Sequence, residues 1–382
     1  MRVRGAIILI VALAVSGGAV FSGARVAPAA VATRELAPLP YAAQTLTAYD
    51  GYVVFSQSNA SGGAWHLMVW HAGAISALPV PRRTVPFDAD AGPGANGQPE
   101  VVFSACAVEP RMLQGQASSG PEDMGGTFGT VLDWSTASGC HIDELGLRGG
   151  ASARVTQISA HGASDTTPTI WRGAIAFARL LQHPHTPPVP EIMLWRSGSP
   201  LRRLAGGPRP CRRAGPCVAE PANAPVGAFV ASMDLGPHAL AVDWYFEGSN
   251  VMEGIGPQWR LLADRLSGGR AADVADGFVG GACTSYNPLS PNESGSSVVV
   301  YAQDQNECEY KPGSSQFEKS AFEPGDIAPT GGGYIAALAK DGTTSYWLRV
   351  EPTNPTVQDD YAPVCEPGVT ACALMQSAAS RD

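Results

Sequence analysis

Lysine is nearly absent from this chain of 382 residues, and charged residues of all kinds make up only 15% of it. The three lysines are Lys311, Lys319 and Lys340, so arginine supplies almost all of the positive charge, and the formal net charge is −9. Binding to nucleic acid or to an anionic membrane surface needs clustered positive charge. An acidic chain without a basic run argues against both functions.

Long apolar runs are missing beyond the N-terminal segment, so no later segment predicts a membrane-spanning helix. The N-terminal segment has Arg2 and Arg4, a glycine-interrupted apolar run over 6–21, and small residues up to Ala32. This order of features is typical of a cleaved signal peptide. We therefore expect residues 1–32 to be removed and the protein to be secreted or held at the cell envelope. Retention of the segment as an uncleaved anchor is the alternative.

Local catalytic and cofactor motifs are also missing. The sequence contains no nucleophile elbow, no zinc-protease helix motif and no phosphate-binding loop. A literal G-x-G-x-x-G is present at 92–97, but an apolar strand follows it where a dinucleotide site needs a helix. We predict a turn there, and we assign no catalytic residue, cofactor-binding residue or metal site from the motifs.

Two loops carry residue types that bind metals, without a complete set of ligands. Asp88 and Asp90 alternate as at the start of a calcium loop, but Pro99 stands where such a loop needs its last glutamate. We expect both carboxylates to shape the turn by accepting backbone N–H groups. His183 and His185 flank a proline and lack a third ligand, so we interpret them as exposed loop residues.

Eight cysteines in an exported chain indicate four disulfides; free thiols in a reducing compartment are the alternative. Cys106 follows a predicted strand over 100–105, and Cys140 precedes a predicted strand over 142–147, so both lie at the same end of neighbouring strands. Their pairing also argues against a metal site at Cys140-His141-Ile142-Asp143. The four predicted pairs are Cys106–Cys140, Cys211–Cys217, Cys283–Cys308 and Cys365–Cys372.

A unit of roughly 50 residues recurs along the chain. It consists of a turn, an apolar strand, a second strand with Trp or Leu, and a Gly-rich end with basic residues. It appears over 50–55 and 66–70, and it returns over 173–177 and 191–195. Short strands at this period are typical of propellers. The strands are apolar at consecutive positions, which is expected when neighbouring sheets cover both faces.

We therefore expect an all-β fold, a β-propeller of four-stranded blades with six blades. The propeller domain is predicted to span 46–372, with 33–45 as a linker or closing strand and 373–382 as a disordered tail. A motif D-x-G-P occurs at 90–93 and again at 234–237, each time shortly before an apolar strand, which supports the repeat.

The third unit reads TPTIWRGAIAFARLL followed by EIMLWRSGSPLRRLAGG and resembles the TolB-like, WD-type propeller repeat. The resemblance covers most of residues 46–350. It implies a propeller and a preference for binding a protein or ligand, since a fold does not fix a function. Nothing here corresponds to the separate α/β domain of the family's Gram-negative namesake, so the partner of that protein is not carried over.

From these features we expect an exported, monomeric, non-enzymatic propeller that binds an envelope or extracellular protein, a glycan or a small ligand. Its contact surface is predicted on loops 107–139, 181–190 and 207–224, and its tryptophans are interpreted as packing between blades. The alternative is a carbohydrate-active hydrolase or lyase with carboxylates in the central channel, because residues from distant blades leave no local motif. Three or more carboxylates, or a histidine–carboxylate cluster, at one end of the channel would favour the enzyme.

Overall fold

The computed structural model describes much of the chain between residues 33 and 378. The described ranges are 33–59, 63–113, 131–152, 155–159, 163–180, 190–206, 228–237, 239–250, 254–265, 272–276, 292–294, 298–303, 306–310, 318–319, 334–352 and 370–378. The predicted signal segment, His183 and His185 lie outside them. Within these ranges, no helix has the length and apolar character that a membrane crossing requires.

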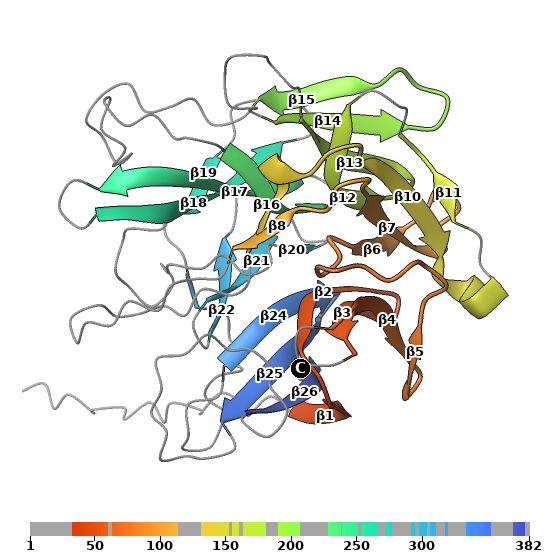
Figure 1. Cartoon of the computed structure of the whole chain (residues 1–382). Coiled ribbons are helices and arrows are strands. Elements are labelled where there is room, and N and C mark those ends of the chain that lie inside the picture. Colours follow the sequence, from red (N-terminus) through yellow and green to blue (C-terminus); the bar gives the residue numbers. More distant parts are fainter. Residues whose placement is uncertain are drawn as a thin grey trace, which may run out of the picture. The chain divides into compact units, whose positions relative to one another are not determined.

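Six four-stranded antiparallel sheets and one two-stranded sheet contain the described strands (Figure 1). The first contains β2 (Ala43–Tyr49), β3 (Tyr52–Ser58), β4 (Trp65–His71) and β5 (Ala74–Ala77). The second contains β6 (Asp90–Pro93), β7 (Pro99–Ala105), β10 (His141–Gly146) and β11 (Thr156–Gln157). The third contains β12 (Ser164–Trp171), β13 (Ala174–Leu180), β14 (Glu191–Arg196) and β15 (Arg202–Gly206).

The remaining three sheets follow the same up-and-down pattern. The fourth contains β16 (Ala228–Leu235), β17 (Ala239–Asn250), β18 (Gly254–Arg265) and β19 (Ala272–Asp276). The fifth contains β20 (Asn292–Ser294), β21 (Val298–Gln303), β22 (Asn306–Tyr310) and β23 (Glu318–Lys319). The sixth contains β24 (Tyr334–Asp341), β25 (Thr344–Pro352), β26 (Thr370–Ala378) and, from the other end of the chain, β1 (Thr33–Leu39).

The first strands of the six sheets form a closed ring of contacts. β2 contacts β6, β6 contacts β12, β12 contacts β16, β16 contacts β20, β20 contacts β24, and β24 contacts β2. A closed ring of six four-stranded sheets is a six-bladed β-propeller, so the predicted fold class is confirmed. We call the two ends of this ring the upstream rim, where the inner strands begin, and the downstream rim, where they end.

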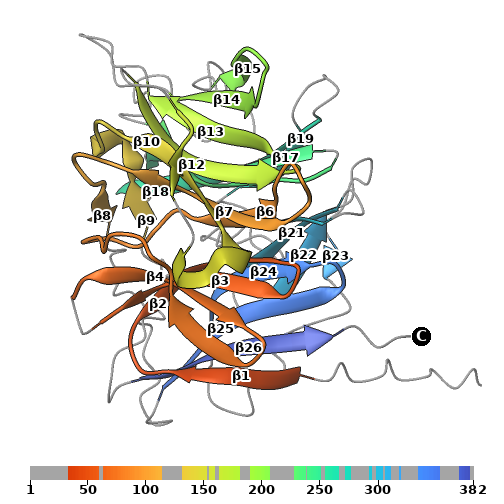
Figure 2. The same ribbon diagram turned by 90° about the vertical axis from the view of Figure 1, so that its right-hand side faces the viewer.

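The sixth blade corrects the predicted boundaries. β26 pairs with β25 on one side and with β1 on the other, and Figure 2 shows β1 and β26 side by side. The residues from 373 to 378 are therefore strand and not a disordered tail. Residues 33–39 are the closing strand, one of the two predictions for 33–45, and the first inner strand begins at 43, before the predicted boundary at 46. Leu374 is fully buried, because strands flank it on both sides. The apolar stretch over 371–375 is short and mostly of small residues, so the sequence alone did not mark it as a strand.

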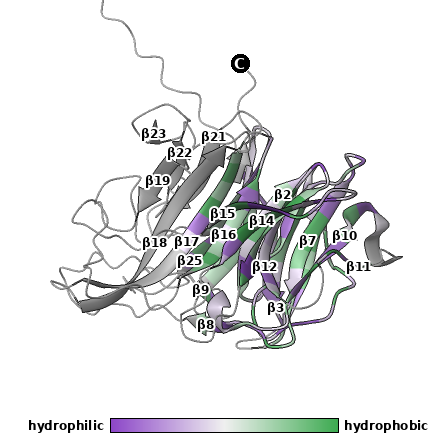
Figure 3. Cartoon of the chain, turned by 90° about the horizontal axis from the view of Figure 1, so that it is seen from above, coloured by the Kyte–Doolittle hydropathy of each residue, from purple (hydrophilic) through white to green (hydrophobic). Residues whose placement is uncertain are grey.

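Apolar side chains pack between neighbouring blades. Val53 and Phe55 of β3 belong to a cluster with Leu348 of the sixth blade, whereas Val54 packs with Val101 of the second blade. Alternate residues of one strand thus cover opposite faces, and both faces are buried. Figure 3 shows the resulting hydrophobic stretches, for example along β7. This explains why the strands are apolar at consecutive positions.

The insertion 107–139 was predicted to be a surface loop, and its described part is instead folded. β8 (Arg111–Leu113) pairs with β9 (Val131–Asp133), and the 3₁₀ helix η1 (Trp134–Thr136) follows. Backbone bonds between 107–108 and 138–139 join this hairpin to the end of β7 and β10. β9 and η1 contact β16 of the fourth blade, so the insertion leaves the second blade and reaches over the upstream rim. A second 3₁₀ helix, η2 (Leu147–Ser152), follows β10.

Candidate functional site

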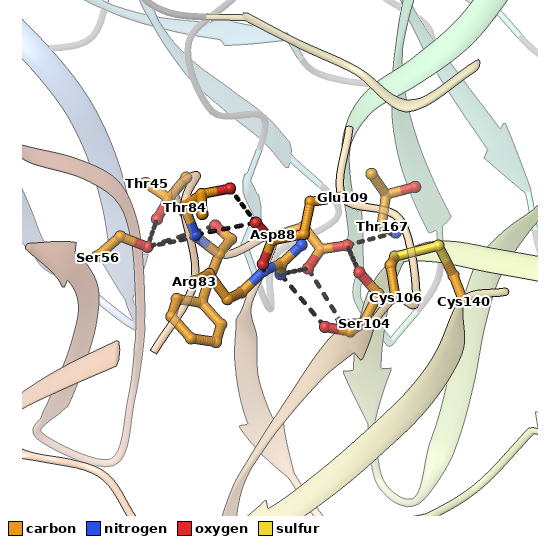
Figure 4. Close-up of polar contacts among 11 residues, drawn as sticks. Thr45, Ser56, Arg83, Thr84, Asp88, Ser104, Cys106, Glu109, Cys140 and Thr167 are labelled. Atoms are coloured by element: carbon orange, nitrogen blue, oxygen red, sulfur yellow. Dashed lines mark hydrogen bonds and ion pairs between the residues drawn. A yellow bond between two sulfur atoms is a disulfide. The ribbon is translucent and has the colours of Figure 1, made fainter. Parts of the chain in front are cut away.

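Polar side chains gather at the upstream rim of the second blade, where the loop from the first blade enters and the insertion leaves (Figure 4). At their centre the guanidinium of Arg83 is almost fully buried. It lies 5.0 Å from the ring centre of Phe87 and 5.7 Å from that of Trp134. Two aromatic rings therefore hold the cation away from water, which strengthens its polar contacts.

Arg83 binds two carboxylates. Its Nη1 lies 3.4 Å from Oδ1 of Asp88, and its Nε lies 3.4 Å from Oε1 of Glu109. Nη1 also donates to the carbonyl oxygen of Ser104 at 3.2 Å. Asp88 precedes the inner strand of the blade and Glu109 belongs to the insertion, so Arg83 joins the two segments. The guanidinium neutralises part of the negative charge of both groups.

Asp88 is a buried acceptor that links two blades. Its Oδ2 accepts the Ser104 hydroxyl at 2.6 Å and the backbone N–H of Thr167 at 2.8 Å. Its Oδ1 accepts the Ser104 N–H at 3.1 Å. The prediction that Asp88 shapes its own turn is therefore wrong, because its N–H partners lie on β7 and on β12. These donors occupy the oxygen atoms that a calcium ion would need.

The described part of the insertion carries two carboxylates, Glu109 and Asp133. Glu109 accepts the Thr84 N–H at 2.9 Å and the Thr84 hydroxyl, and its side chain is 25% exposed. Asp133 lies 3.2 Å from Nη2 of Arg111, whose side chain is 64% exposed. The rim thus presents a partly open carboxylate and a more open guanidinium on the same hairpin.

A histidine–carboxylate pair lies on the same blade. Nε2 of His141 lies 3.4 Å from Oδ1 of Asp143, and the His141 side chain is 32% exposed. Burial raises the pKa of Asp143, and His141 opposes the shift. Asp143 stands opposite Phe103 in the strand pairing, and the Phe103 ring packs against Phe87. The pair therefore shares a face of the blade with the aromatic packing around Arg83.

The disulfide predicted between Cys106 and Cys140 is present beside this pair, with Cα atoms 3.9 Å apart. It closes the base of the insertion, and it leaves Cys140 unable to bind a metal with His141. Cys372 is also disulfide-bonded, and its predicted partner Cys365 lies outside the described residues. The remaining two predicted pairs depend on Cys211, Cys217 and Cys283, which lie outside the described residues as well.

Two threonines near this site have backbone conformations that β-branched residues rarely adopt. Thr45 has φ 53° and Thr167 has φ 47°, each at a bulge in its inner strand. In the described part of the chain, Oγ1 of Thr167 and Nη2 of Arg83 are buried without a hydrogen-bond partner. Left-handed residues and unsatisfied buried groups concentrate at functional sites.

A polar bridge lies deeper in the ring, around the second carboxylate of the predicted turn. Oδ1 of Asp90 accepts the Thr47 hydroxyl at 2.7 Å, and Oδ2 accepts the Thr169 hydroxyl at 2.7 Å and the Ile170 N–H at 2.9 Å. Burial raises the pKa of Asp90 to about 6, although its hydrogen bonds oppose the shift. Asp90 therefore joins the inner strands of three blades and does not shape a surface turn.

The inner strands approach closely at this bridge. A Cβ on Gly92 would lie 2.2 Å from the carbonyl oxygen of Ile170, so only glycine fits beside β12. Thr169 also accepts the Leu235 N–H at 2.7 Å, as Thr47 accepts the Ala91 N–H at 2.9 Å. The bridge thus continues into the fourth blade, and it is structural.

The second blade carries another carboxyl pair, which predicts a pH dependence of stability. Burial and then the neighbouring Glu100 raise the pKa of Glu144 to about 7. Its folded pKa exceeds its ordinary value, so stability should fall as the pH rises from about 5 to about 7. Replacing Glu144 with Gln should raise the melting temperature by about 2 °C near pH 8 and leave it unchanged near pH 4. Melting temperatures measured between pH 4 and pH 8 test this prediction, with Glu191→Gln as the control. If the melting temperatures of Glu144→Gln and wild type change in parallel with pH, the prediction is contradicted.

No protein-family model matches the sequence, and a search of curated proteins finds no match. Solved β-propellers are similar in fold. A gluconolactonase from Xanthomonas campestris has 12% identity and a TM-score of 0.44, covering 91% of this chain and 89% of that one. An α-L-arabinanase from Penicillium chrysogenum has 7% identity and a TM-score of 0.46, covering 89% and 98%. The six-bladed Aleuria aurantia lectin, which recognises fucose, has 10% identity and a TM-score of 0.40, covering 82% and 90%.

The expectation of a non-enzymatic binding protein is corrected by these comparisons. The similar structures are mostly enzymes, and they also include an arabinofuranosidase and a polysaccharide lyase. At these sequence identities the similarity concerns the fold alone. Candidate catalytic residues therefore have to be identified from the side chains of this protein.

The sequence did not single out Arg83, Glu109 or Asp133, because they lie in loops without a motif. His141 and Asp143 were considered only as metal ligands. An alternating histidine and aspartate at the start of a strand is the signal that would have marked them as a pair, since alternate residues share a face.

Proposed function

We propose that this protein is a carbohydrate-active enzyme, a hydrolase or a lyase, acting at the upstream rim of its second blade. One observation carries the proposal: Asp88, Glu109 and Asp133 gather at one rim, and the His141–Asp143 pair stands at the start of β10 on the same blade. Breaking a glycosidic bond needs one group that gives a proton to the leaving oxygen and one that removes a proton or activates water. Carboxyl groups and imidazoles are the side chains that do this.

The exposures assign different roles to these groups. Glu109 and His141 are the partly open members, and they are the ones that reach a substrate. Asp143 orients the His141 imidazole and stabilises its protonated form, as a carboxylate does beside a catalytic histidine. Asp88 is enclosed by its donors and acts as a positioning residue through Arg83. Arg111, held by Asp133, is the open cation that would bind an acidic group of a substrate.

Activity assays on glycans test the proposal. The protein is incubated with neutral and uronate-containing polysaccharides, and new reducing ends and unsaturated products are measured to separate hydrolysis from elimination. We expect Glu109→Gln and His141→Ala to lower kcat/KM by about 100-fold or more with little change in melting temperature.

His71→Ala is the matched control, because His71 is an exposed histidine stacked on Tyr52 in the first blade. It should leave kcat/KM unchanged. Full activity in both Glu109→Gln and His141→Ala would overturn the assignment of residues. Failure of the wild-type protein to cleave any of the polysaccharides would overturn the proposed function.

We also propose that the protein is exported, monomeric and built from TolB-like repeats. The N-terminal segment supports export, as does the Cys106–Cys140 disulfide, because such bonds persist mainly in oxidising compartments. The third blade supports the repeat, since its four strands span the quoted resemblance.

A further inference from the structure

Two aromatic rings meet at the downstream rim, at the opposite end of the inner strands. Tyr49 is the last residue of β2, and Trp171 is the last residue of β12. Their ring centroids lie 6.4 Å apart at an interplanar angle of 80°. β6 contacts both strands, so the two rings meet past the end of this shorter strand. Each ring is half-buried, packed on one side against the core between blades.

Three charged side chains lie near Tyr49. Burial raises the pKa of Tyr49, Asp50 and Asp341 raise it further, and Arg172 lowers it, so all three charges act on the hydroxyl. Asp50 and Arg172 are exposed. Oδ2 of Asp50 lies 3.0 Å from Nη2 of Arg148, and Oδ2 of Asp341 accepts the Gly51 N–H at 2.9 Å.

The turns that carry these charges are fixed in place. Arg172 has φ 49°, an unfavourable conformation for arginine, and Gly173 follows with φ 69°. The Gly173 N–H donates to the Pro93 carbonyl at 3.1 Å. A Cβ on Gly173 would lie 2.7 Å from the Cβ of Ala95, so this turn is wedged against the turn of the second blade. Arg172 is therefore presented from a rigid support.

We propose that the downstream rim binds a sugar ring of a glycan on the Tyr49–Trp171 pair, as a second site away from the acid–base groups. The rings offer an apolar surface for the C–H face of a sugar. Asp50 and Arg172 supply acceptors and donors for its hydroxyl groups, and a few placed polar groups on an aromatic surface are what fixes a ligand's orientation. The pair lies across the inner strands from the upstream rim, so binding here does not require the chain to be an enzyme.

Calorimetric titration with cellohexaose, mannohexaose and arabinohexaose tests the proposal. The titrations use the Glu109→Gln background, so that the probes are not consumed. We expect at least one probe to bind, and Trp171→Ala and Arg172→Gly each to weaken its Kd by about tenfold. Trp171→Phe keeps a ring and should stay within about threefold. Arg172→Gly suits a left-handed position, so its melting temperature should not fall.

The controls separate this site from the upstream one. Arg203→Ala alters an exposed side chain of the outermost strand of the third blade and should bind as the background does. Unchanged Kd values in both Arg172→Gly and Trp171→Ala, or no binding of any probe, would overturn the second site and leave the proposed enzyme standing. If binding depends on Trp171 but the wild-type protein cleaves no polysaccharide, the second site stands and the proposed enzyme is overturned.

Discussion

Replacing Asp90 with alanine is expected to lower the free energy of unfolding by about 3–5 kcal/mol, because three buried donors lose their acceptor at once. The donors are the hydroxyls of Thr47 and Thr169 and the N–H of Ile170, which come from the blades on either side. None of them can reach water in the middle of the inner strands, so each keeps its desolvation cost.

Thermal and urea unfolding measure this effect, with a fall in melting temperature of roughly 5–15 °C. Asp50→Ala is the control, since its pair with Arg148 is exposed and contributes about 0–1 kcal/mol. Because the folded pKa of Asp90 is raised to about 6, its stabilising contribution declines as the pH rises from about 4 to about 6. The loss in the alanine variant should therefore be larger near pH 5 than near pH 8. Equal melting temperatures for Asp90→Ala and wild type would show that the bridge contributes nothing.

Removing the Cys106–Cys140 disulfide by a double substitution with serine is expected to cost about 3–4 kcal/mol. The two cysteines are 34 residues apart in sequence, and chain-entropy reasoning for a loop of this size gives that magnitude. The double variant avoids leaving one reactive thiol. The ring should still form, because the other blades keep their own contacts.

Melting temperature and limited proteolysis check this expectation together. The insertion over 107–139 should become the first site of cleavage, while the rest of the chain resists. Arg111→Ala is the control, because it alters an exposed side chain of the same insertion and keeps the bond. If proteolysis of the double variant begins outside the insertion, the Cys106–Cys140 disulfide does not have the role of fixing the insertion.

The blades could be predicted from the sequence because their turns and apolar strands repeat. Their boundaries in the sixth blade could not, since β26 has few large side chains and its pairing with β1 spans nearly the whole chain. The threonines at 45 and 47 recur at 167 and 169, just as D-x-G-P recurs at 90 and 234. The threonine pairs lie on the first and third blades, and the D-x-G-P motifs lie on the second and fourth. The two motifs together predict the polar bridge, whereas D-x-G-P alone indicated only a repeat.

Of the candidate site, only the Cys106–Cys140 disulfide could be predicted from the sequence. Cys106 and Cys140 follow from strand ends, which local patterns locate well. Arg83 contacts Glu109 because the loop between the first two blades and the insertion of the second blade both lie at the upstream rim. Such contacts depend on the three-dimensional path of the loops, and the spacing of residues along the chain does not encode it.

The sixth blade takes its outermost strand from the start of the chain and its other three from the end. β1 therefore has no partner until β26 has been made, more than 330 residues later in the chain. Until β1 has paired, β26 presents an unpaired edge, which is a template for association with other chains. Completion of the ring is consequently a late, long-range step, and such steps are slow. A chain that lacks β1 or β26 would therefore leave the sixth blade incomplete, with an exposed strand edge beside the inner contact between β24 and β2.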